Sequence, residues 1–180
     1  IDQFVDLGAG QTSIQLRNAA KAQSWGGEAS LEARPIERLN LSLGVGYAHA
    51  TFDRFPDGGG PGVDLDGNRL PYAPRLTASG ELRYGVPLGS DLKLDLSGDW
   101  TYRSASFSGP ENLDRQRIDA RHLLGARAAL VGGRFEVAGW VRNLLDARYI
   151  DNRIFDFFQT AVVERGEPRT YGMTLTLRTR

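Results

Sequence analysis

Apolar and polar residues alternate along this chain over segments that are longer than most strands of soluble proteins. Between residues 38 and 47 every odd position is Leu, Val or Tyr, and the even positions after Arg38 are Asn, Ser and Gly. Residues 75–86 and 92–103 repeat the pattern on their even positions, which hold Leu, Tyr, Trp and Val together with small residues. A period of two that persists this long predicts β-strands rather than amphipathic helices.

The same parity continues more faintly in four other segments, which are residues 27–34, 124–130, 135–141 and 171–180. The exception within them is Trp140, which falls on the polar parity. Counting back from Arg180 gives seven predicted strands, and residues 1–6 are expected to form the tail of an eighth. The pattern therefore predicts an all-β, antiparallel chain.

The connections between these strands alternate between two lengths. Three are short turns, at residues 35–37, 87–90 and 132–133, and three are long, at roughly 53–71, 105–118 and 149–168. Outer-membrane β-barrels combine short periplasmic turns with long extracellular loops, and strands of about 9–11 residues suffice to cross the bilayer. The alternation predicts the wall of a transmembrane β-barrel.

Aromatic residues of the apolar parity gather near the ends of the predicted strands. Four lie toward the long loops: Tyr47, Trp100, Tyr102 and Tyr171. Tyr84 and Phe135 lie near the short turns, so the two groups have the placement of the aromatic girdles of a membrane barrel. The alternative is a soluble β-sandwich in which these aromatics form the core, although sandwich strands usually have only about five to six residues.

Composition narrows the classes of function. The 22 basic and 22 acidic residues cancel, so no charge imbalance favours nucleic acid as a partner. The chain has no cysteine, and no apolar run approaches the roughly 18 residues of a transmembrane helix. A mean hydropathy of -0.36 would by itself suggest a soluble domain, but strands that alternate in polarity also give such a value.

The residues offer no constellation for catalysis or for metal binding. His49 and His122 are too few and too isolated for a histidine metal site, and no serine lies in a nucleophile-elbow sequence. Asp64, Asp66 and Asn68 have the spacing that opens a calcium loop, but the next residue is not the Gly that such a loop needs, so an Asp-Gly turn explains them better. We therefore expect no enzyme, no metal site and no cofactor.

Four short motifs resemble, in order and spacing, those of the barrel of TonB-dependent receptors. The segments are residues 18–22 (NAAKA) followed by Gly27-Glu28, residues 66–74 (DGNRLPYAP), residues 141–149 (VRNLLDARY) and residues 168–172 (PRTYG). They are similar to the family patterns NAGKA…GxE, GNxLPxAP, VxNLFDxxY and PRxYG. Leu145 stands where the family usually has Phe, and Ala20 stands at the Gly of NAGKA.

The resemblance implies that residues 1–180 are the C-terminal portion of the barrel, with about seven or eight strands of roughly 22. It also implies an N-terminal plug domain and a TonB-contacting region, which we expect to lie outside this sequence. The last strand of the family ordinarily ends on an aromatic residue, and the position after Arg180 would share the parity of Tyr171.

The implied function is TonB-energised uptake of a scarce nutrient, above all an iron–siderophore complex, across the outer membrane of a Gram-negative bacterium. The expected partners are outer-membrane lipid, the TonB complex of the inner membrane, the barrel-assembly machinery and a metal-chelate ligand. Aromatic faces suit catecholates, and arginines suit anionic chelates. The candidate ligand contacts are therefore loop aromatics and arginines: Phe55, Arg115, Arg117, Arg153, Phe155, Phe157, Phe158 and Arg165.

Two other classes of function remain open. One is a passive porin or a small eight-stranded outer-membrane barrel without energised transport, and the other is a secreted all-β binding module. A plug domain upstream would support the receptor, whereas a signal peptide immediately before Ile1 would support the small barrel. Solubility without detergent would support the secreted module.

Overall fold

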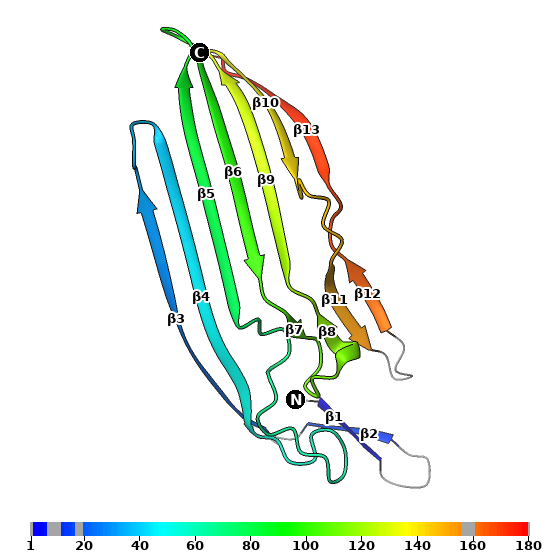
Figure 1. Cartoon of the computed structure of the whole chain (residues 1–180). Coiled ribbons are helices and arrows are strands. Elements are labelled where there is room, and N and C mark those ends of the chain that lie inside the picture. Colours follow the sequence, from blue (N-terminus) through cyan, green and yellow to red (C-terminus); the bar gives the residue numbers. More distant parts are fainter. Residues whose placement is uncertain (1, 7–11, 17–19, 156–160, 180) are drawn as a thin grey trace.

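The computed structural model of this chain describes residues 2–6, 12–16, 20–155 and 161–179. Its main element is a curved, seven-stranded sheet in which each strand pairs with its neighbours in antiparallel fashion (Figure 1). Across the sheet the strands are β3 (Lys21–Ala33), β4 (Leu39–Arg54), β5 (Leu76–Pro87), β6 (Lys93–Arg103), β9 (Arg121–Val131), β10 (Phe135–Arg142) and β13 (Thr170–Leu177). The predicted all-β antiparallel fold is confirmed.

The sheet is open within the described residues, because β3 and β13 are its two edges. Residues 1–6 were expected to add an eighth strand, and that expectation is wrong. β1 (Asp2–Asp6) instead pairs with β2 (Thr12–Leu16) in a separate two-stranded sheet, so its backbone partner lies within its own hairpin.

The register of the sheet places all apolar residues of the alternating pattern on one side. Leu41, for example, lies opposite Ala33 of β3 and Leu82 of β5, and Leu82 lies opposite Gly98 of β6. We call this side the apolar face. It holds the odd-numbered residues of β4, β10 and β13, the odd-numbered residues of β3 from Trp25 onward, and the even-numbered residues of β5, β6 and β9. The remaining residues of these strands form the polar face.

The apolar face is exposed rather than packed against another layer of the described chain. Leu43 is 42% exposed, and Tyr171 and Met173 on the edge strand are 80% and 79% exposed. Among the described residues the buried hydrophobic side chains are Phe52, Phe55, Leu65, Ile118, Ala129 and Ala138, and none of these lies on the apolar face. A soluble sandwich would bury such a face, so this arrangement fits a sheet whose apolar side meets another apolar phase.

The two ends of the sheet differ in the length of their connections (Figure 1). At one end, which we call the turn end, short turns join β3 to β4, β5 to β6 and β9 to β10. At the other, the loop end, lie β7 (Ser106–Phe107), a short 3-10 helix (Asp114–Gln116), β8 (Arg117–Ile118), β11 (Ile150–Phe155) and β12 (Ala161–Arg165). No helix in the described ranges has the length and apolar character needed to cross a membrane.

Aromatic residues mark the loop end of the apolar face, as the sequence predicts. Trp25 stacks on His49 with ring centroids 5.0 Å apart, and Trp100 stacks on His122 at 6.0 Å. The indole N–H of Trp100 also donates to Nδ1 of His122 at 3.2 Å, and Tyr102 lies 4.6 Å from the same imidazole. Each Trp therefore has its polar edge or ring face beside a histidine, as suits a boundary between apolar and wet surroundings.

Candidate functional site

The long connections at the loop end form a layer with its own small core. This loop layer comprises residues 55–74, 104–120 and 143–169 as far as they are described. Phe52 at the end of β4 packs against Phe55 with ring centroids 4.9 Å apart, and Leu65 joins them; the three are 3%, 2% and 4% exposed. Phe55 was expected to contact ligand, but the structure places its ring inside the loop, where it stabilises packing.

The first loop is shaped by aspartates that accept backbone hydrogen bonds. Asp64 accepts from the backbone N–H of Asp57 at 3.0 Å, and Asp66 accepts from that of Phe55 at 2.5 Å. Gly67 follows with a φ of 78°, a left-handed conformation that glycine adopts without strain. The Asp-Gly turn interpretation therefore accounts for these carboxylates, and the described residues contain no group of three His, Asp or Glu placed to hold a metal ion.

The segment that resembles GNxLPxAP ties the first loop to the second. Arg69 donates its backbone N–H to the side chain of Asn112 at 2.7 Å, and Asn112 donates back to the Arg69 carbonyl at 3.0 Å. Asn68 donates to the carbonyl of Pro110 at 3.0 Å, and the Arg69 guanidinium donates to the carbonyl of Ala105 at 2.8 Å. These reciprocal bonds hold the two loops in one register.

The first loop also contacts the third through a tyrosine. The hydroxyl of Tyr72 lies 2.8 Å from the side-chain oxygen of Asn152 and 3.0 Å from the carbonyl of Arg153. Burial raises the pKa of Tyr72 above its ordinary value, so the phenol stays protonated and able to donate. Arg153 in turn donates to the carbonyl of Arg115 in the second loop, so all three loops are joined.

Three of the predicted ligand contacts meet at this junction. The guanidinium of Arg115 lies over the ring of Phe155, 5.6 Å from its centroid, and Arg153 reaches the backbone of Arg115. The half-buried Phe155 and the exposed Arg115 therefore offer an aromatic face and a cation side by side.

The other predicted contacts are more scattered. Arg117 is exposed and forms an ion pair with Asp119 at 3.0 Å. Arg165 is exposed at the end of β12, opposite Ile150 of β11. Phe157 and Phe158 lie outside the described residues.

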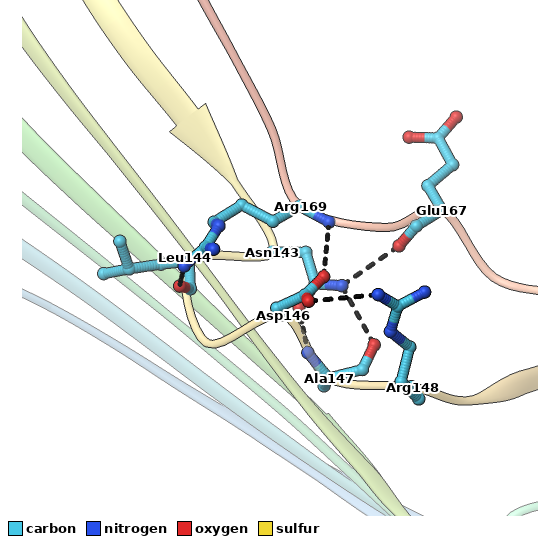
Figure 2. A network of polar contacts seen from close by, with 7 residues as sticks. All are labelled: Asn143, Leu144, Asp146, Ala147, Arg148, Glu167 and Arg169. Atoms are coloured by element: carbon cyan, nitrogen blue, oxygen red, sulfur yellow. Dashed lines mark hydrogen bonds and ion pairs between the residues drawn. The ribbon is translucent and has the colours of Figure 1, made fainter.

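A polar clamp closes the third loop where it leaves and rejoins the sheet (Figure 2). Asn143, which is 8% exposed, donates to the carbonyls of Ala147 and Glu167, each at 3.0 Å. Its side-chain oxygen accepts from the backbone N–H of Ala147 at 2.9 Å. Asn143 therefore joins the end of β10 to the segment that leads into β13.

Asp146 completes the clamp from the same turn. It accepts from the backbone N–H of Arg169 at 3.1 Å and from the guanidinium of Arg148 at 3.2 Å, and Arg169 donates to the carbonyl of Leu144 at 3.4 Å (Figure 2). The bond from Arg169, with the nearby positive charges, holds the pKa of Asp146 below its ordinary value. The segments that resemble VxNLFDxxY and PRxYG thus contact each other, which explains their shared role in bounding the loop.

The sequence interpretation missed Tyr72, Asn112 and Asn152 as joints between loops. Tyr72 and Asn112 have φ values of 56°, as unusual for residues other than glycine as the 49° of Asn143 in the clamp. These conformations aim a hydrogen-bonding side chain from one loop at the backbone or side chain of another. Only the Asn residues carried a sequence signal, because Asn tolerates this conformation best.

Comparison with known proteins identifies the family. Residues 1–144 match the family described as TonB dependent receptor-like, beta-barrel. The fold is similar to the ferric yersiniabactin uptake receptor FyuA from Yersinia pestis (TM-score 0.75, 19% identity, 89% of this chain and 24% of that one). It is also similar to BauA, the ferric preacinetobactin receptor from Acinetobacter baumannii (TM-score 0.69, 20% identity, 98% and 25%).

A third similar structure is the ferric citrate transporter FecA in its unliganded form (TM-score 0.68, 21% identity, 88% of this chain and 24% of that one). This chain thus spans about a quarter of the length of the solved receptors that it matches. Those proteins and the matching family are transport receptors rather than enzymes. The open seven-stranded sheet is part of a barrel wall, and the chain belongs to the TonB-dependent receptor-like β-barrel family.

Proposed function

We propose that this chain forms the C-terminal portion of the barrel of an outer-membrane receptor that imports a ferric chelate with energy delivered through TonB. The full barrel would have roughly 22 strands and a plug domain. The plug and the TonB-contacting segment would be supplied by sequence other than these 180 residues.

The observation that carries this proposal is the loop layer at one end of the polar face. Three loops that are far apart in sequence are joined through Tyr72, Arg69 and Arg153, and the joined loops present Arg115 beside Phe155. A rigid strand framework that displays joined loops is a common arrangement for binding, and an aromatic face beside a guanidinium suits a partly aromatic, anionic ligand. The structurally similar receptors for ferric yersiniabactin and ferric preacinetobactin support an iron chelate as the ligand class.

The apolar face supplies the second support. In the proposed barrel, exposed residues such as Leu43 and Met173 face lipid in the outer membrane of a Gram-negative bacterium, and the polar face lines the lumen. The open edges at β3 and β13 would pair with the remaining strands of the barrel during assembly by the barrel-assembly machinery.

The test is uptake of radioactive iron by cells that produce a complete receptor polypeptide containing residues 1–180. Uptake of a panel of ferric chelates is measured in cells with TonB and in otherwise identical cells without it. We expect at least one chelate to bind both cells and to accumulate only in those with TonB. Equal accumulation without TonB would contradict the proposal and favour a passive porin, and a receptor that binds and accumulates none of the chelates would contradict it as well.

A further inference from the structure

Three arginines lie in a row on the polar face directly beside the loop layer. Arg103, the last residue of β6, lies opposite Thr77 of β5 and opposite Arg121 of β9. Arg75 precedes β5 and has the parity of Thr77, so it is the diagonal neighbour of Arg103. Directly opposite residues have Cβ atoms about 5 Å apart and diagonal neighbours about 7–8 Å apart. β6, β9 and the residue that leads into β5 thus bring three positive charges together.

Only one of these charges is neutralised within the described chain. Arg121 forms an ion pair with Asp151 at 2.6 Å, and its guanidinium lies 4.8 Å from the ring centroid of Tyr149. Arg75 and Arg103 are exposed, and neither guanidinium has an ion-pair or hydrogen-bond partner among the described residues. Like charges placed opposite each other on a sheet repel, so this row would be more stable with an anion in reach.

Two acidic residues of the same face, Glu28 and Asp99, are too far from Arg103 to form an ion pair with it. Glu28 shares the row of Arg103, but Gly46 and Thr77 on two intervening strands separate them, a distance of about 14 Å at the strand spacing of a sheet. Asp99 lies four residues before Arg103 on the same strand, at a similar separation. Neither carboxylate can form an ion pair with Arg103 from its position on the sheet.

The neighbouring loop layer adds to the positive character of this region. The pKa of Arg69 is lowered by burial and, to a smaller extent, by the charges of Arg75 and Arg117. Among the described residues, the buried Nε atoms of Arg69 and Arg153 have no hydrogen-bond partner. Unused donors and uncompensated charge therefore occur together at the loop end.

The turn end of the polar face is different, since the basic residues of its strands each have a carboxylate partner. Arg83 pairs with Glu81, and Lys93 pairs with Asp95 at 2.8 Å. Glu136 receives both Arg127 and, at 3.5 Å, Arg178. Among these turn-end arginines Arg83, Arg127 and Arg178 thus each have a carboxylate partner, whereas Arg75 and Arg103 at the loop end have none among the described residues.

We propose that Arg75 and Arg103, flanked by Arg121, form an anion-binding row on the lumen wall that selects a negatively charged ferric chelate. The inference rests on the proposed function and names the ligand class of that site. A guanidinium offers two parallel N–H donors to a carboxylate or to the oxygens of a catecholate complex, and it does so best where water is partly excluded. A ligand leaving the loop layer would meet this row next.

The test uses the complete receptor with the double substitution Arg75→Gln and Arg103→Gln. The matched control is Arg134→Gln, which removes an exposed arginine at the turn between β9 and β10. Equilibrium binding is measured with three probes: ferric citrate as a carboxylate chelate, an anionic ferric tris-catecholate, and an uncharged ferric trihydroxamate. The amount of folded receptor and its melting temperature are measured without ligand.

We expect the double variant to bind at least one anionic probe about tenfold more weakly, the equivalent of about 1.4 kcal/mol. The uncharged probe and the Arg134→Gln control should be unaffected, and the anionic probe that loses affinity identifies the carboxylate or the catecholate class. Equal losses for all probes, or a lower melting temperature without ligand, would overturn the inference and assign the row to the plug or the fold. If the wild-type receptor imports a chelate through TonB and the double variant binds every probe with unchanged affinity, only this inference is overturned.

Discussion

The sheet and the loop layer bury their side chains in opposite ways. On the apolar face of the sheet, large side chains such as Leu43, Leu82 and Met173 remain 42%, 44% and 79% exposed. In the loop layer, Phe55 and Leu65 are only 2% and 4% exposed. The loop layer therefore carries a core of its own, whereas the sheet holds its shape by backbone pairing and needs apolar surroundings for its side chains.

This difference separates the structural role from the binding role. Substitutions on the apolar face of the sheet should change how much receptor assembles, because in the proposed barrel this face contacts lipid. Substitutions on the exposed surface of the loop layer should change ligand binding in a receptor that assembles normally. The clamp at Asn143 and Asp146 belongs to both the sheet and the loop layer, since it joins the third loop to β10 and β13.

The largest effect is expected from a charge on the apolar face. Leu43→Arg places a guanidinium between Leu31 and Gly80 and should destabilise the barrel by about 2–4 kcal/mol. Ser42→Arg is the matched control, because its neighbours on the polar face are Glu32 and Glu81, which would accept the new charge. Unfolding in denaturant measures both, and equal costs would mean that the two faces are assigned wrongly.

Removal of the clamp should have the next largest effect. Asn143→Ala removes a buried amide and its three hydrogen bonds to backbone groups of Ala147 and Glu167, at a cost of about 1–3 kcal/mol. Leu144→Ala changes an exposed side chain of the same turn and should be nearly neutral. Limited proteolysis of residues 147–168 reports the loss, and protection that is equal in both variants would show that the clamp does not hold the loop.

Loss of the loop aromatics should weaken binding without affecting assembly. Replacement of Phe155, Phe157 and Phe158 by Ser removes the ring beside Arg115, so we expect ferric-chelate affinity to fall several-fold, on the order of 1 kcal/mol. Val162→Ser is the control in the same hairpin, opposite Ile154 and 60% exposed. Labelled-chelate binding is normalised to surface receptor. Unchanged binding would assign these rings to loop packing, and loss of the receptor would assign them to the fold.

The smallest effect concerns pH and Asp146. Because its pKa is lowered in the folded protein, its contribution is complete above the ordinary value of 3.8 and is lost as the pH falls through the folded value. The third loop should therefore exchange its amide hydrogens faster in this acidic range, and Asp146→Asn should remove that pH dependence. An identical acid response in the variant would place the titrating group elsewhere.

The alternation of residues predicted the sheet because one face of each strand must match an apolar phase. The prediction worked best for the part of the sheet between the turn end and the loop end. β5, for example, was expected at residues 75–86 and is observed at Leu76–Pro87. It failed at the loop end, where β4 continues to Arg54 although the alternation stops near Tyr47. Beyond that point the loop layer buries Phe52, which has the parity of the polar face. An apolar residue at the end of this strand therefore no longer marks the apolar face.

The candidate site was predicted less well than the sheet. Phe55 was chosen as a ligand contact because it is an aromatic residue in a loop. Its burial depends on how the loop folds back onto β4, which no local sequence pattern encodes. The hairpin of β11 and β12 lay inside a segment expected to be a long loop, and of its residues Arg153, Phe155 and Arg165 were chosen as ligand contacts. The arginine row depends on the register between β5, β6 and β9, so neighbours in space were distant in sequence.

The central claim is that the loop layer binds the ligand and the turn end does not. Its most direct test compares two exposed leucines, one at the loop end and one at the turn end. Because the chain has no cysteine, Leu113→Cys in the loop layer and Leu88→Cys at the turn end can each be labelled alone in a complete receptor that contributes no other cysteine. Each variant carries a fluorophore, and its emission is followed as a ferric chelate that supports uptake is added. We predict a saturable change at position 113 and none at position 88. An equal change at both positions, or a change at position 88 alone, would contradict the assignment of ligand binding to the loop layer.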